Sequence, residues 1–222
     1  MRSLAQPGVL RGAIIAASIS ALVCYPRLSL WATRRYPLWY LEAVLLLGGT
    51  VLWAFVFAWH TKYTGRPVFN WKLEPLPLGL ATVSGLGAAV LLHVFVDPTL
   101  RARNPEEYPA SLGQWFAMTL FSLAFTQLIL LFAPFAWLVR LIRRPEPAAI
   151  MTVIFGMFVL WIKNHSSKVP FPPSLMLAVL AVRLVVGLLS VYFFLRGGVF
   201  LVWWWELLVQ GRNLVELGRG EN

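Results

Sequence analysis

The chain has 222 residues, of which 59% are hydrophobic and 13% are charged. A soluble domain carries about 25% charged residues, so this chain has too little polar surface for a water-soluble particle of its size. Its formal net charge is +10 at pH 7. Most basic residues lie in short loops between apolar runs, so we expect them to contact anionic lipid headgroups and not nucleic acid. Because Cys24 is the single cysteine, an intrachain disulfide and a thiolate metal cluster are excluded.

The first apolar run follows Arg2 and Arg11 and so imitates a signal peptide. No small-x-small cleavage site precedes a polar mature start, and we therefore expect a retained first helix over about Val9–Tyr25. A basic loop, Pro26–Pro37, contains the pair Arg34-Arg35. The second predicted helix, Leu38–His60, is long enough to cross the ~30 Å hydrocarbon core of a bilayer.

After a polar loop with three helix breakers, Thr61–Leu76, the third predicted helix covers Pro77–Val96. Small residues on it predict close packing against another helix, as small-xxx-small faces do in lipid. They are Gly79, Ala81, Ser84, Gly85, Gly87, Ala88 and Ala89. The next stretch, Asp97–Gly113, is the most polar of the chain, and its Glu106-Glu107 pair has the prolines and arginines of a solvated connector around it.

The fourth predicted helix starts near Gln114, and its apolar run to Ile142 exceeds one span, so we expect Pro134 to kink or divide it. After it we predict a basic turn, two further helices joined by a proline-rich loop, and a glycine break before a last apolar stretch and a polar tail. These are Arg143–Pro147, Ala148–Ile162, Lys163–Pro173, Ser174–Leu195, Gly197-Gly198 and Val199–Val209.

These runs predict an all-α polytopic transmembrane bundle of about six to eight spans, forming a single domain over residues 1–222. With seven spans, nine of the 19 Lys and Arg residues fall on each side and Arg183 lies within a helix. The positive-inside rule needs an imbalance, so the membrane orientation stays open.

Ionisable and polar residues within the spans are the default functional candidates, because they are costly in a bilayer unless they are satisfied. Arg183 and Glu206 lie in consecutive apolar segments and could form either a polar functional site or a structural ion pair that fixes helix register. Gln210 shares a helix face with Glu206. Thr126 and Gln127 complete the candidate polar site.

His93 is a weak candidate ligand for a cofactor, since it is a lone histidine near a helix end. The sequence has no HExxH motif, so we predict no metal site, and we predict no cofactor. A two-aspartate protease is excluded by the single Asp97. A rhomboid-type serine site is not supported either, because Ser84 lacks the expected preceding glycine and His93 is too far along the helix to serve as its base.

Residues Leu112–Leu217 resemble the CAAX protease and bacteriocin-processing family (CPBP or Abi), a family of intramembrane glutamic proteases. That family has helices with Glu-Glu-xxx-Arg, Phe-xxx-His and His-xxx-Asn motifs, in that order, with a basic turn and a glycine turn between them. The corresponding segments here are Phe116–Leu131, the basic turn Arg140–Pro145, Ile150–Ile162, Gly187–Phe200 with Arg196-Gly197-Gly198 at its turn, and Trp203–Gly211.

The catalytic residues of the family are not retained at these positions. Thr126-Gln127 stands in place of the Glu-Glu pair, and Leu131 in place of the arginine. Ile162 replaces the histidine four residues after Phe158, and Glu206-xxx-Gln210 takes the place of His-xxx-Asn within one residue of alignment. Since Gln, Ile and Thr cannot accept the proton that this chemistry moves, the resemblance implies a degenerate, non-proteolytic member with no catalytic residue.

We therefore expect an accessory or scaffold subunit of a larger membrane complex, in contact with lipids and a membrane-protein partner, in the bacterial inner (cytoplasmic) membrane. One alternative is a divergent intramembrane hydrolase that uses Glu206 with Glu106, Glu107 or His165. Another is a transporter or channel-like subunit with Arg183 and Glu206 along a polar path, or a pigment- or quinone-associated subunit that uses His93.

Overall fold

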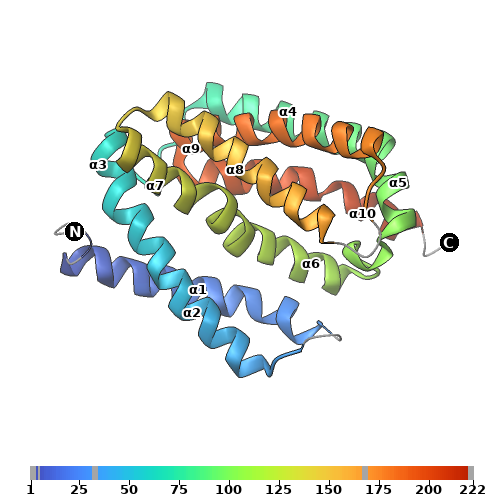
Figure 1. Ribbon diagram of the computed structural model, residues 1–222, viewed down its shortest axis with the longest axis horizontal. Helices are drawn as coiled ribbons and strands as arrows, with labels where there is room; N and C mark the ends of the chain where they lie inside the picture. The colour runs from blue at the N-terminus through green and yellow to red at the C-terminus, as the bar shows by residue number, and fades with distance from the viewer. Residues whose placement is uncertain (1–3, 5, 32–34, 167–169, 220–222) are drawn as a thin grey trace.

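The computed structural model describes residue 4 and residues 6–31, 35–166 and 170–219, and its regular elements in these ranges are all helices (Figure 1). Six of the helices are long and apolar enough to cross a membrane. The protein is therefore an all-α polytopic membrane bundle, as predicted. Arg34 of the predicted basic loop and residues 167–169 of the predicted proline-rich loop lie outside the described residues.

The first two spans form an antiparallel hairpin of α1 (Pro7–Ser29) and α2 (Leu38–Phe55). Contrary to the prediction, Pro26 does not end α1, because its carbonyl accepts a hydrogen bond from the Leu30 amide at 3.1 Å and closes one more turn. A π-helical turn η1 (Val56–His60) and the short α3 (Thr61–Thr64) extend α2. Within the hairpin, the Trp53 indole donates to the Ser20 hydroxyl at 3.2 Å.

The third span also continues past its predicted end. It consists of α4 (Pro75–Leu91), a π-helical turn η2 (Leu92–Val96) and α5 (Asp97–Arg103), before a 3₁₀ turn η3 (Pro105–Glu107). The polar residues Asp97–Arg103 were predicted as part of a connector. They are helical because Pro98 fits the first turn of α5, where its missing N–H costs nothing.

The fourth span is one long run made of α6 (Leu112–Phe121), η4 (Ser122–Thr126), η5 (Leu128–Phe132) and α7 (Ala133–Ile142), where η4 and η5 are π-helical. Pro134 lies in the first turn of α7, directly after the two π-helical turns, so the regular helix is interrupted where the proline predicts it. Arg143, with φ of 59°, ends α7, and α8 (Pro145–His165) follows.

The last span, α9 (Pro173–Gln210), folds back on itself at Gly198, and α10 (Arg212–Arg219) follows it. The rings of Phe193 and Trp205 have centroids 6.0 Å apart, although twelve residues in a straight helix would span about 18 Å. Residues 173–197 and 199–210 therefore run antiparallel, and the described chain starts and finishes at opposite ends of the bundle (Figure 1).

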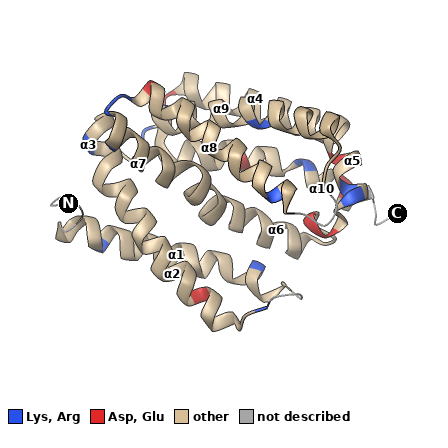
Figure 2. Cartoon of the chain, viewed as in Figure 1, with Lys and Arg blue, Asp and Glu red and all other residues tan. Residues whose placement is uncertain are grey.

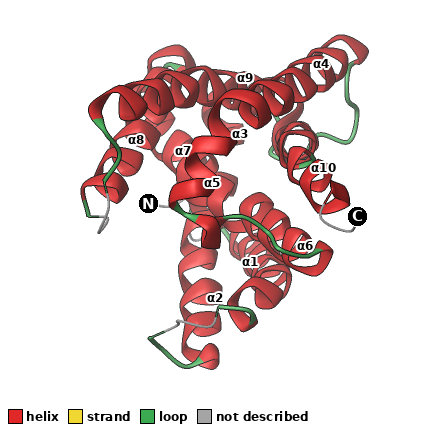
Figure 3. Ribbon diagram, turned by 90° about the vertical axis from the view of Figure 1, so that its right-hand side faces the viewer, coloured by secondary structure: helices red, strands yellow, loops and turns green. Residues whose placement is uncertain are grey.

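The helices form three groups, with α6 and α7 between the α1–α2 hairpin on one side and α4, α8 and α9 on the other (Figures 1 and 3). The largest core side chains lie along the central helices and include Trp53, Phe132, Phe135, Phe194 and Trp205. Charged residues lie mostly at the two ends of the bundle (Figure 2). On α4, Ala81, Gly85 and Ala89 are buried, and Gly85 lets Leu208 of α9 approach closely.

Gly198 should be the least replaceable glycine of the chain. Its φ of 65° and ψ of −157° belong to a region that essentially glycine alone adopts, and a Cβ would lie 2.3 Å from the Val68 carbonyl oxygen. We expect Gly198→Ala to lower the free energy of unfolding in detergent by at least about 1–3 kcal/mol. Gly87→Ala is the matched control, since a Cβ there meets open space and alanine favours the helix. Equal unfolding midpoints for the two variants would contradict the assigned turn.

Candidate functional site

The most polar point inside the bundle is the carboxylate of Glu206, which is 7% exposed. Its Oε1 accepts hydrogen bonds from the Ser122 hydroxyl at 3.0 Å and from Gln210 Nε2 at 2.8 Å. Its Oε2 accepts one from Gln127 Nε2 at 3.2 Å. Three donors suit an ionised carboxylate, which can only accept hydrogen bonds. We call Glu206, Ser122, Gln127 and Gln210 the carboxylate cluster.

The π-helical turn η4 explains why both Ser122 and Gln127 contact the same side chain. Its hydrogen bonds join residues five positions apart, so the two residues share a face that an α-helical period would separate. Sequence reasoning identified Gln127, Glu206 and Gln210 but missed Ser122. The five-residue spacing from Ser122 to Gln127, close before Pro134, is the signal that could have found it.

Arg183 lies beside this cluster without touching its carboxylate. The ion pairs among the described residues do not include Arg183 with Glu206, so the predicted direct pairing is not present. The guanidinium instead faces α8, where its Nη2 lies 3.5 Å from the position a Cβ on Gly156 would occupy. A cavity of about 20 Å³, lined by Arg183, Gln127 and Thr152, separates the two groups and has room for one water.

The remaining sequence candidates lie elsewhere. Thr126 is half-buried and shares no hydrogen bond with the carboxylate cluster among the described contacts. The His93 imidazole Nε2 is 3.4 Å from Glu216 of α10, so this histidine is engaged with a carboxylate at the helix ends. Glu107 pairs with Lys163 at 2.7 Å. Within the described part of the chain, no group of three or more His, Cys, Asp or Glu residues could hold a metal ion.

A second polar cluster, which the sequence did not predict, closes the end of the bundle near the C-terminus. The Asp97 carboxylate is 3% exposed, accepts from Arg212 Nε at 2.9 Å and accepts from the Tyr108 hydroxyl at 3.1 Å. Arg101 adds an ion pair with Glu216 at 3.0 Å and places its guanidinium 4.8 Å from the centre of the Tyr108 ring. These contacts fix α5 and the Tyr108 segment to α10.

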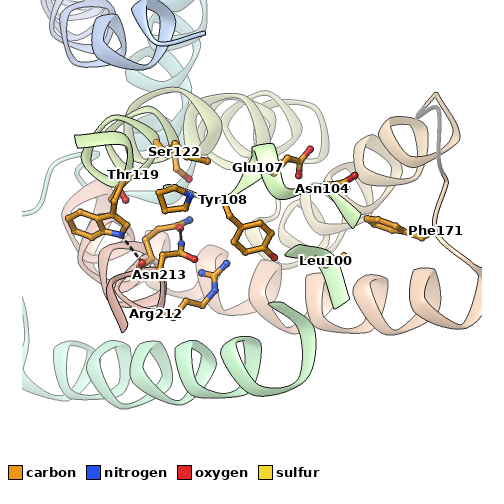
Figure 4. Close-up of a pocket in the computed structure, with 13 residues that line it drawn as sticks. Leu100, Asn104, Glu107, Tyr108, Thr119, Ser122, Phe171, Arg212 and Asn213 are labelled. Carbon is orange, nitrogen blue, oxygen red and sulfur yellow. Dashed lines mark hydrogen bonds between the residues drawn. The ribbon is translucent and has the colours of Figure 1, made fainter. Parts of the chain in front are cut away.

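A cavity of about 300 Å³ lies between the two polar clusters (Figure 4). Tyr108 and Arg212 line it near the end of the bundle, while Ser122 and Gln210 line it at its deeper side. Because both deeper residues donate to Glu206, the buried carboxylate is one hydrogen bond away from the cavity. The cavity is therefore the polar route from the helix ends to the carboxylate cluster.

No protein-family model matches the chain, and no curated protein sequence or solved structure matches it either. The resemblance to the CPBP proteases therefore stays a prediction. Two of the positions quoted for it, Gln127 and Glu206, are in contact. The third does not join them, because Ile162 is 42% exposed on the outer face of α8, where the buried positions include Thr152 and Gly156.

Replacing the central carboxylate should weaken the bundle. In Glu206→Gln one of the three donors would face an amide NH₂ instead of an oxygen, and we expect the free energy of unfolding to fall by about 1–2 kcal/mol. Glu146→Gln is the matched control because Glu146 is exposed at the start of α8. Denaturation in mixed micelles measures both variants. An unchanged stability in Glu206→Gln would show that the carboxylate cluster holds nothing together.

Tyr108 should make stability fall at high pH. Burial and the neighbouring Asp97 carboxylate raise the pKa of its hydroxyl above the usual value of about 10. As pH rises past that value, the unfolded chain loses this proton while the folded chain keeps it, so the free energy of unfolding decreases. Tyr108→Phe should remove this part of the decrease, whereas the same change at the exposed Tyr36 should not. Parallel stability curves for parent and Tyr108→Phe above pH 10 would contradict this.

Proposed function

We propose that this protein is a non-catalytic accessory or scaffold subunit of a larger membrane complex, built on a degenerate CPBP-like bundle. One observation carries the proposal: the buried carboxylate of Glu206 is bound by three uncharged side chains, from Ser122, Gln127 and Gln210. None of these groups takes up a proton near neutral pH, so they cannot serve as the proton-accepting partners of a glutamic protease. They do join two distant segments of the chain, which is a structural role.

The outer helices provide surface for a partner within the bilayer. In the apolar stretch of the third span, 17% of the residues are buried inside the bundle, so most of its surface faces outward. Gly79 and Gly87 lie on this helix with open space where a Cβ would be. Exposed glycines on a transmembrane helix allow a second helix to approach closely, which supports a helical partner at α4.

We further propose the bacterial inner membrane as the location. The family resemblance favours a bacterial protein, and spanning α-helices agree with the inner membrane because bacterial outer-membrane spanning proteins are β-barrels. Contact with anionic lipids is supported by the basic residues at the helix ends, such as Arg143 and Arg144 at the turn before α8.

The test is purification of the full chain in a mild detergent, followed by native mass spectrometry. We expect a co-purifying membrane protein in fixed stoichiometry. Gly79→Leu and Gly87→Leu should reduce its amount because the larger side chain blocks close helix contact. Gly8→Leu is the control, since Gly8 also faces open space but lies at the start of α1. A chain that remains alone in every mild detergent would contradict the proposal.

A further inference from the structure

The 300 Å³ cavity contains a buried acceptor without a partner. Asn213 on α10 is 6% exposed, and its Nδ2 donates to Gln210 Oε1 at 3.3 Å. Its Oδ1 is buried and has no hydrogen bond. A buried acceptor left unpaired costs about 1–3 kcal/mol, so this atom is suited to receive a donor from a molecule in the cavity.

The charges around the cavity favour a cation. Arg212 is neutralised by Asp97 at 2.9 Å, and Glu107 by Lys163 at 2.7 Å. Glu206 has no cation at ion-pair distance among the described residues, and its negative charge reaches the cavity through Ser122 and Gln210. The remaining field in the cavity is therefore negative.

The other lining groups fit an ammonium group better than a bare metal ion. Thr119 and Ser122 contribute hydroxyl oxygens that can accept hydrogen bonds, and Tyr108 and Trp115 contribute aromatic rings, which attract organic cations. A volume of about 300 Å³ lies at the lower end of the range for small-molecule sites and is far larger than a single ion requires.

We propose that this cavity binds a primary ammonium group, which donates N–H to Asn213 Oδ1. The cavity lies where α5, α6 and α10 meet, at the end of the bundle, and so at the level of lipid headgroups (Figures 1 and 4). The ethanolamine headgroup of a phospholipid supplies this group from the bilayer, and a free amine supplies it from water. The site does not depend on the proposed scaffold role.

The test titrates the delipidated full chain in detergent with three probes and follows binding by native mass spectrometry. The probes are phosphatidylethanolamine, phosphatidylcholine with the same acyl chains, and free phosphoethanolamine. We expect phosphatidylethanolamine to bind about tenfold more tightly than phosphatidylcholine, because a trimethylated nitrogen cannot donate to Asn213. Equal or tighter binding of phosphatidylcholine would overturn the proposal. Binding of phosphoethanolamine as tight as that of the lipid would support the ammonium site with water as its source.

Variants locate the preference. Asn213→Ala should remove the discrimination between the two lipids, and Thr119→Val should weaken it in a chain that keeps the Asn213 side chain. Asn70→Ala is the control, because Asn70 lines a separate cavity at the opposite end of the bundle and its Oδ1 accepts from the Lys72 amide. A lipid preference that survives in both Asn213→Ala and Thr119→Val would contradict the assigned site.

Discussion

A carboxylate inside a bilayer must be hydrogen-bonded, and Glu206 imposes this constraint on the whole bundle. Two of its donors, Ser122 and Gln127, precede it by 84 and 79 residues, so the fourth span and the second half of α9 must lie side by side. The third donor, Gln210, comes from the next turn of its own helix and holds the carboxylate from the opposite direction along the chain. The donors are neutral, which makes the arrangement supportive and leaves no proton-transfer partner.

Two backbone features make this contact possible. Gly198 turns α9 back on itself, and without that turn Glu206 would lie beyond the end of the bundle. The π-helical turn η4 places Ser122 and Gln127 on one face of the fourth span. The Asp97–Arg212 ion pair then fixes the chain after Glu206 to α5, and the cavity lies between these two attachments. The proposed ammonium site follows from this placement, since it uses the charge of Glu206 and the unpaired oxygen of Asn213.

Much of this fold is readable from hydropathy, because helices in lipid need long apolar runs and because Pro134 and Gly198 interrupt them for local reasons. Gln127 and Glu206 stand out as polar residues in such runs. The role of Ser122 was not predictable from an α-helical period, since it depends on a π-helical turn. The Arg183–Glu206 pairing failed because side-chain direction around each helix decides it. Asp97 and Arg212 are 115 residues apart, and no local pattern joins them.

The central claim is that Glu206 and Gln127 hold the fourth span against α9. A double-mutant cycle with Glu206→Ala, Gln127→Ala and the combined variant tests it most directly, with the free energy of unfolding measured in mixed micelles. Residues in direct contact couple by about 0.5–3 kcal/mol, and we expect a coupling energy within that range that stabilises the parent chain. Losses that simply add, within about 0.3–0.5 kcal/mol, would show that the two residues act independently and would contradict the account.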